Sequence, residues 1–82
     1  MTTTTLPTRA DDELRVRIAA LVEQAISERS SVWAVARDAR IPRTTLTRRL
    51  KGETPGFYFY ELEEICRVLD VSLLDLVKAA ES

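Results

Sequence analysis

The sequence predicts an all-α fold, a compact domain of five helices without strands. Only two glycines and three prolines occur among the 82 residues, so little of the chain suits tight turns. Ala, Leu, Arg and Glu, which favour helices, are plentiful. Hydrophobic residues recur at steps of three and four along most of the chain, which is the spacing of one helix face. This length suits a single domain with one core.

Composition also excludes several classes of function. With no histidine and one cysteine, the chain has no zinc-binding cluster, no internal disulfide and no histidine base. Paired carboxylates, a nucleophile with its base and a phosphate loop are also missing at any usable spacing. We therefore expect no catalytic, metal or cofactor site. Because no apolar signal core and no stretch near 18 apolar residues occurs, we expect a cytoplasmic protein without membrane contact.

The first helix is predicted over residues 11–28. Residues 1–9 are rich in threonine and have no periodicity, which predicts a flexible tail before a folded domain of residues 10–82. Asp11, Asp12 and Glu13 are expected in the first turn, where free amide groups favour negative charge. The apolar stripe of this helix consists of Leu14, Ile18, Leu21, Val22, Ala25 and Ile26.

Two short helices are predicted next. Ser31 can cap a helix of about two turns. Pro42 cannot continue that helix and suits the first turn of a third one over residues 42–50. Gly52 stands where helices commonly end. The inward residues are Val32, Val35, Ala36 and Ala39 in the second helix and Leu46 and Leu50 in the third.

A loop and two further helices complete the chain. Pro55 and Gly56 predict a loop, and a fourth helix is expected over residues 59–69. Ser72 with Asp75 three residues later is similar to a capping box, so a fifth helix is expected from there to about residue 80. The apolar residues are Leu62, Ile65, Cys66 and Leu69 in the fourth helix and Leu73, Leu74, Leu76, Val77 and Ala80 in the fifth.

Positive charge is concentrated in one segment. Residues 37–51 hold six basic residues against Asp38 alone, a net of +5, while the rest of the chain carries six basic and twelve acidic residues, a net of −6. Such a segment attracts phosphate on one face and repels it elsewhere, which orients an approaching polyanion. A solvated charged helix is the alternative interpretation.

Two short helices joined by a turn, the second of them basic, are what a helix-turn-helix unit needs to place one helix in the major groove of DNA. The stretch SVWAVARDARIPRTTLTRRLKG (residues 31–52), followed by LEEICRVLDVSLLDL (residues 62–76), resembles the phage Cro and repressor (XRE-type) helix-turn-helix domain. The similarity spans residues 14–77. It implies a lambda-repressor-like DNA-binding domain whose helix-turn-helix is formed by the second and third helices.

The resemblance also implies site residues. Four residues near the start and along the outer face of the third helix would meet the bases, and arginine and threonine have suitable chemistry for this. Residues around them would contact phosphate. For each cation of these sets the alternative is simple solvation, and for Trp33 it is burial beside the first helix. The base-reading set is Arg43, Thr44, Thr47 and Arg48, and the phosphate set is Ser31, Trp33, Arg37, Arg40, Arg49, Lys51 and Tyr58.

Three further points stay open. The family commonly has glycine where Arg40 stands and often serine where Pro42 stands, so either Arg40 adopts a strained left-handed backbone or the turn is reshaped. The aromatic run of residues 57–60 is expected partly to cover the core. The fifth helix is either packed entirely on the first or offers an exposed surface for a homodimer, formed by Leu73, Leu74 and Val77.

The leading prediction is a sequence-specific, double-stranded DNA-binding transcriptional regulator, a Cro-like repressor acting on an operator in a bacterial host cell. Because the chain ends just after the fifth helix, we expect no small-molecule effector. The alternative is a small helical protein-interaction module, such as an antitoxin or an adaptor, for which DNA binding is secondary or absent. The basic segment favours the regulator, because a pure protein adaptor does not require it.

Overall fold

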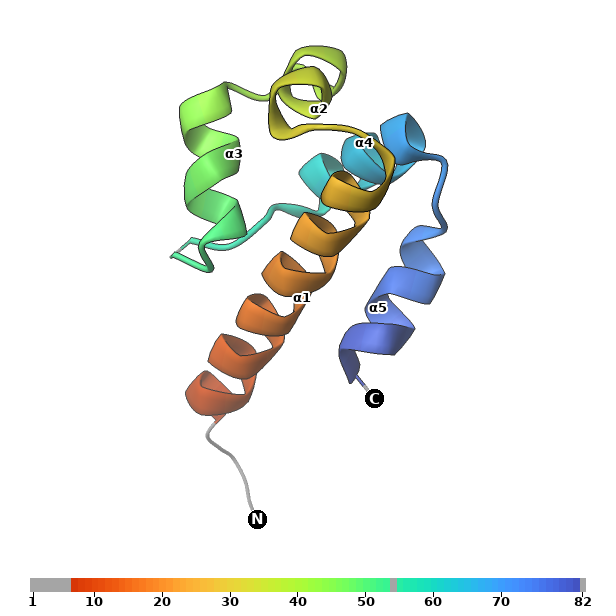
Figure 1. Ribbon diagram of the computed structural model, residues 1–82. Helices are drawn as coiled ribbons and strands as arrows, with labels where there is room; N and C mark the ends of the chain where they lie inside the picture. Colours follow the sequence, from red (N-terminus) through yellow and green to blue (C-terminus); the bar gives the residue numbers. More distant parts are fainter. Residues whose placement is uncertain (1–6, 54, 82) are drawn as a thin grey trace.

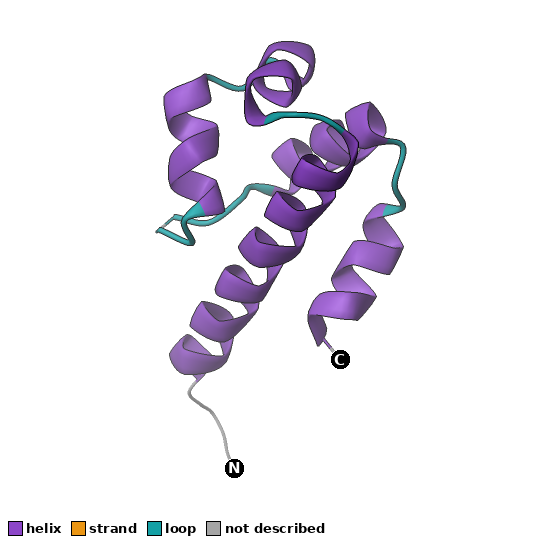
Figure 2. Ribbon diagram, viewed as in Figure 1, coloured by secondary structure: helices purple, strands orange, loops and turns teal. Residues whose placement is uncertain are grey.

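The computed structural model describes residues 7–53 and 55–81, with side chains from residue 13 onward. These ranges contain five helices and no strand (Figure 1; Figure 2). The prediction of an all-α fold with five helices is therefore confirmed. None of the helices is both long enough and apolar enough to cross a membrane. Their bounds are α1 Pro7–Arg29, α2 Val32–Ala39, α3 Arg43–Leu50, α4 Phe59–Leu69 and α5 Leu73–Glu81.

Helix α1 begins earlier than the sequence pattern predicts. It starts at Pro7 instead of residue 11, since proline suits the first turn of a helix, where its missing N–H group has no partner to lose. No acidic residue lies in the first turn, so the predicted placement of Asp11, Asp12 and Glu13 there is wrong. Residues 1–6 of the predicted tail lie outside the described residues.

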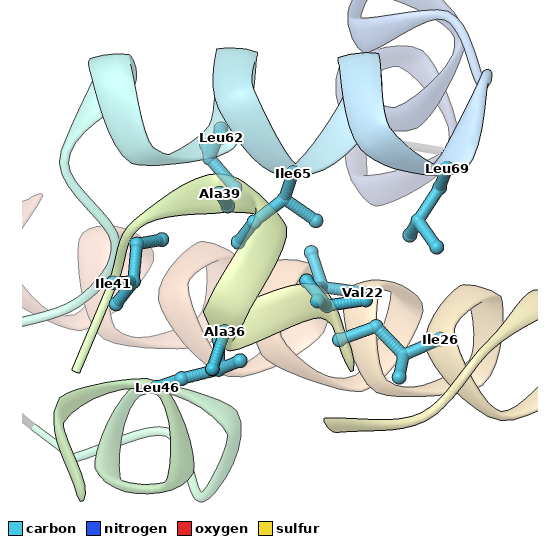
Figure 3. Close-up of a cluster of buried hydrophobic side chains, with 10 residues drawn as sticks. Val22, Ile26, Ala36, Ala39, Ile41, Leu46, Leu62, Ile65 and Leu69 are labelled. Carbon is cyan, nitrogen blue, oxygen red and sulfur yellow. The ribbon is translucent and has the colours of Figure 1, made fainter. Parts of the chain in front are cut away.

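The core lies where α1, α2, α3 and α4 meet. Helix α1 runs diagonally through the molecule and packs on each of the other four helices, while α2 packs on α3 and α4 (Figure 1). Figure 3 shows Ala36 of α2 beside Leu46 of α3, where a small side chain lets the two helices approach. The buried cluster comprises Val22, Ile26, Val35, Ala36, Ala39, Ile41, Leu46, Leu62, Ile65 and Leu69.

Helices α2 and α4 end in the same way. Each is followed by a residue in the left-handed region, Arg40 (φ 60°, ψ 40°) and Asp70 (φ 58°, ψ 46°). The next residue then donates its N–H to a carbonyl of the last turn: Ile41 to Ala36 O at 3.0 Å, and Val71 to Cys66 O at 3.0 Å. This arrangement satisfies carbonyl groups that the helix itself leaves unpaired and turns the chain sharply toward the next helix.

Three arginines of α1 hold the carboxyl ends of three other helices. Each guanidinium donates to a carbonyl oxygen at or just beyond the end of a helix, where the helix dipole favours positive charge. These arginines lie outside the basic segment of residues 37–51, and this contact gives them a structural role. The bonds are Arg15 Nε to Gly52 O (2.9 Å), Arg29 to Leu69 O (3.2 Å) and Arg17 to Ala80 O (3.2 Å).

Candidate nucleic-acid interface

The turn between α2 and α3 consists of residues 40–42. Arg40 adopts the left-handed backbone itself, which decides between the two alternatives left by the sequence. This conformation costs a residue with a side chain on the order of 1 kcal/mol relative to glycine. Ile41 is 6% exposed and belongs to the core, and Pro42 precedes the first residue of α3. The turn is therefore anchored by Ile41 while Arg40 stays exposed.

Helix α3 divides into a buried face and an exposed face. Leu46 is fully buried, and Leu50, four residues later, is half-buried against the core. Because α3 lies at the edge of the molecule, its opposite face is open to solvent (Figure 1). The four residues predicted to read bases are all exposed and share that open side: Arg43, Thr44, Thr47 and Arg48.

The cations on and beside α3 differ in their pairing. Arg40, Arg43 and Lys51 have no ion-pair partner among the described residues. Arg48 lies 3.7 Å from Glu53, with both side chains more than half exposed. Such a solvent-exposed pair contributes at most about 1 kcal/mol and exchanges easily for another anion. The outer face of α3 therefore presents positive charge that a polyanion can reach.

The first turn of α2 and the start of α3 line one hollow, with Trp33 on one side and Arg43 on the other. Ser31 caps α2 by accepting a hydrogen bond from the Ala34 N–H at 3.2 Å, which confirms its predicted capping role. Trp33 is 58% exposed, so the alternative that it is buried beside α1 is wrong. The Arg37 guanidinium lies 5.0 Å from the centre of the Trp33 ring, within the range of a cation–π contact. A shallow hollow is lined here by Trp33, Ala36, Arg37, Ile41 and Arg43.

Arg37 is partly neutralised by its neighbour. Its Nε donates to Asp38 Oδ1 at 3.0 Å, and both side chains are about half exposed. This hydrogen bond lowers the pKa of the Asp38 carboxyl, so Asp38 stays ionised at neutral pH. The local positive field at α2 is therefore weaker than the count of arginines indicates.

Arg49 does not lie where the sequence interpretation expects it. Its side chain is only 13% exposed, and its Nε lies 3.2 Å from Glu61 Oε1 of α4. A second bond runs to the Pro55 carbonyl at 3.1 Å. The alternative of a solvated Arg49 is wrong, because the side chain is largely buried against Glu61 and Pro55, while the predicted phosphate contact stays a prediction. The sequence analysis did not predict the pairing of Arg49 with Glu61, because no local pattern joins residues in two different helices.

The aromatic run divides between core and surface. Phe57 packs against the core, whereas Phe59 and Tyr60 are 65% and 63% exposed. Tyr58 is half exposed, and its ring stacks on that of Tyr60 with centres 5.9 Å apart. Tyr58 lies beside the end of α3, since the Arg49 guanidinium is 5.2 Å from the centre of its ring. The phenol of Tyr58 thus lies on the border of the α3 face.

The predicted dimer surface on α5 is smaller than the sequence indicates. Leu73 and Val77 are half-buried, and Leu73 packs against the core. Leu74 is 62% exposed. Helix α5 thus packs against α1 and α4 but leaves Leu74 outside, so the alternative in which it is packed entirely on α1 is wrong.

Comparison with known families agrees with this geometry. Residues 15–81 match the family model of the Cro/C1-type HTH DNA-binding domain. No match to the chain was found among curated proteins or among solved structures. The matched range covers most of the chain and includes all of α2, α3, α4 and α5. The chain belongs to the family of Cro/C1-type helix-turn-helix DNA-binding domains.

Proposed function

We propose that this protein is a sequence-specific transcriptional regulator that inserts α3 into the major groove of double-stranded DNA. The observation that carries the proposal is the outer face of α3, where two arginines and two threonines are exposed while Leu46 is fully buried. A helix of this kind, braced by a second helix across the groove, is the reading unit of helix-turn-helix proteins. Membership in the Cro/C1-type family supports DNA binding in general.

The chemistry of the outer face suits base recognition. Arg43 and Arg48 can each donate two hydrogen bonds to O6 and N7 of guanine. Thr44 and Thr47 can bond a base edge or contact the methyl group of thymine. A good two-bond contact discriminates against a wrong base pair by about 1–3 kcal/mol. We assign the reading of bases to these four residues.

The residues around α3 are proposed to bind the DNA backbone. Free N–H groups at the amino end of α2 and exposed cations are the usual partners of phosphate oxygens. The exposed Trp33 indole can donate one further hydrogen bond. Arg49 is left out of this set because its guanidinium is bonded to Glu61 and Pro55. The proposed phosphate contacts are Ser31, Trp33, Arg37, Arg40, Lys51 and Tyr58.

We further propose that the protein acts as a Cro-like repressor and binds its operator as a homodimer. Two-fold symmetric operators present half-sites one helical turn apart, which two copies of α3 can occupy together. Leu74, exposed on α5 beside the half-buried Leu73 and Val77, supplies an apolar contact for the second copy. If so, Leu74→Glu will shift the mass measured by analytical ultracentrifugation toward the monomer. An unchanged mass distribution would rule out this dimer surface.

The direct test is selection from a library of randomised DNA duplexes. The purified protein is expected to enrich a defined sequence, with a logarithm of affinity that falls linearly with the logarithm of salt concentration. Arg43→Ala should weaken binding to the enriched duplex, whereas Lys78→Ala, which removes one positive charge from α5, should not. Failure to enrich any sequence, with equal binding to all duplexes or none, would favour the interaction module. Exposed Phe59 and Tyr60 would then be the first residues to examine as a protein contact.

A further inference from the structure

The ion pair between Arg49 and Glu61 lies beside α3 and takes no part in the proposed DNA contacts. It joins the last turn of α3 to the first turn of α4 across the loop of residues 51–58. Glu61 is 4% exposed as a residue and is the one charged residue buried among the described residues. Removing two charges from water is costly, so such a pair is weak as a source of stability.

The geometry of the pair is directional. Glu61 Oε1 accepts from Arg49 Nε at 3.2 Å and from the Tyr58 N–H at 2.9 Å. Arg49 also donates to the Pro55 carbonyl at 3.1 Å and lies under the Tyr58 ring. The planar guanidinium has fixed donor directions, so these bonds define an orientation more narrowly than apolar contacts do. The pair therefore ties α3, its following loop and the start of α4 into one arrangement.

This arrangement limits the rotation of α3 about its own axis. Leu46 and Arg49 both face the protein, one turn apart, and the exposed residues occupy the remaining sides. If Arg49 were replaced by an apolar residue, Leu46 would still hold α3 by burial and Arg15 would still bond Gly52 O just beyond its carboxyl end. No directional bond from a side chain of α3 to α4 would remain. A small rotation there would move the side chains of Thr47 and Arg48 away from their base edges.

We propose that Arg49 and Glu61 are positioning residues for sequence recognition. They contact no DNA and instead hold the outer face of α3 at the angle that base reading requires. Their contribution then lies in the discrimination between DNA sequences and leaves the attraction to phosphate unchanged. This inference rests on the proposed function, since it presupposes that α3 reads bases.

The test uses the charge-conserving double variant Arg49→Met/Glu61→Gln. The glutamine keeps an oxygen for the Tyr58 N–H, and the net charge of the protein does not change. The ratio of affinities for the selected duplex and for a scrambled duplex should fall about tenfold, as expected for a weakened base contact. The salt dependence of binding should keep its wild-type slope, because no phosphate contact is lost.

A matched control is Lys51→Met, which removes an exposed cation two residues from Arg49. It should weaken binding to both duplexes alike and reduce the salt slope by about one. The proposal is overturned if the double variant, shown by circular dichroism to be folded at the assay temperature, retains the wild-type ratio. It is equally overturned if the double variant behaves as Lys51→Met does, since Arg49 would then be a phosphate contact.

A second variant covers the case in which the double variant does not fold. Arg49→Lys keeps the charge but lacks the planar fork that reaches Glu61 and Pro55 together. We expect its ratio of affinities for the selected and scrambled duplexes to lie between those of the wild type and the double variant, with an unchanged salt slope. A full wild-type ratio would contradict the need for directional bonds. Failure of the proposed function is separately visible, because the wild-type protein would then enrich no duplex.

Discussion

Arg40 combines an unfavourable backbone with a useful position. Its φ of 60° lies in the left-handed region, which closes α2 and turns the chain into α3. Glycine would adopt this backbone without the steric cost that a side chain carries. The retained arginine is exposed next to the outer face of α3, where a cation attracts phosphate. Arg40 therefore combines a strained backbone with a proposed contact to DNA.

This conflict predicts opposite effects of one substitution. Arg40→Gly should raise the free energy of unfolding by about 1 kcal/mol, because the left-handed backbone is no longer strained. The same change should weaken DNA binding through the loss of a phosphate contact. Arg40→Ala is the matched control: it loses the charge but keeps the strain. Urea unfolding that finds both variants equally stable would contradict this account of the turn.

Cys66 gives a second prediction at the residue scale. The residue is 4% exposed, and burial raises the pKa of its thiol above the ordinary value. The native protein should therefore react slowly with iodoacetamide at pH 8 and rapidly after denaturation. As pH rises past the ordinary thiol pKa, the unfolded state releases a proton that the folded state holds, so the stability from the neutral thiol is lost. Comparison with Cys66→Ala isolates this pH dependence, and rapid labelling of native protein would disprove the burial argument.

At the scale of elements, α1 acts as the support on which the other helices are held. Arg15, Arg17 and Arg29 each bond a carbonyl at the end of another helix. The loop after α3 depends on the first of these, because Gly52 accepts from Arg15 and Gly56 lies against the Arg15 side chain. A Cβ atom added at Gly56 would lie 2.6 Å from Arg15 Cγ, so the arginine would have to move.

Gly56→Ala is therefore expected to lower the free energy of unfolding by about 1 kcal/mol, mainly through loss of the bond between Arg15 and Gly52. In an Arg15→Ala background the same substitution should cost little, since the colliding side chain is gone. Thermal or urea unfolding of the two single variants and the double variant measures this coupling. Strictly additive effects would show that Gly56 acts through its own backbone instead.

The elements were largely predictable from the sequence, and the exceptions have physical reasons. Ser31 predicted the start of α2, and Pro42 and Gly52 predicted the bounds of α3 to within one residue. The start of α1 was missed because Pro7 among threonines was interpreted as part of a tail, although proline also suits a first helical turn. The sequence could not predict ion pairs between helices, because Arg49 and Glu61 are twelve residues apart and only the packed fold brings them together.

At the scale of the whole molecule, charge and shape are arranged around one face. The chain is almost neutral, with a formal net charge of −1, yet the segment of residues 37–51 carries +5. Arg49 is paired internally and Arg37 is partly offset by Asp38, so the attraction to DNA depends on fewer cations than the sequence count indicates. We therefore expect a salt slope shallower than six phosphate-binding cations would give, with weak binding to unrelated DNA.

The burial of α3 residues also shows what a sequence can predict of such a site. The resemblance to the helix-turn-helix family implied that four residues face outward from α3, and all four are exposed: Arg43, Thr44, Thr47 and Arg48. The sequence analysis left the exposure of Trp33 open, because a lone tryptophan fits a core as well as a surface. The inward residues predicted for α2, among them Val35, Ala36 and Ala39, are the buried ones, and they leave Trp33 on the open side.

The central claim is that α3 reads bases, and the most direct test follows Arg43. For wild type and Arg43→Ala, affinity would be measured for the selected duplex and for duplexes in which each base pair is replaced in turn. In the wild type, replacing a base pair that Arg43 reads should weaken binding by about 1–3 kcal/mol. We predict that Arg43→Ala abolishes this loss at one base pair, while replacement of the other base pairs weakens binding as it does in the wild type. A uniform loss of affinity with every penalty intact would contradict the claim, since Arg43 would then contact only the backbone.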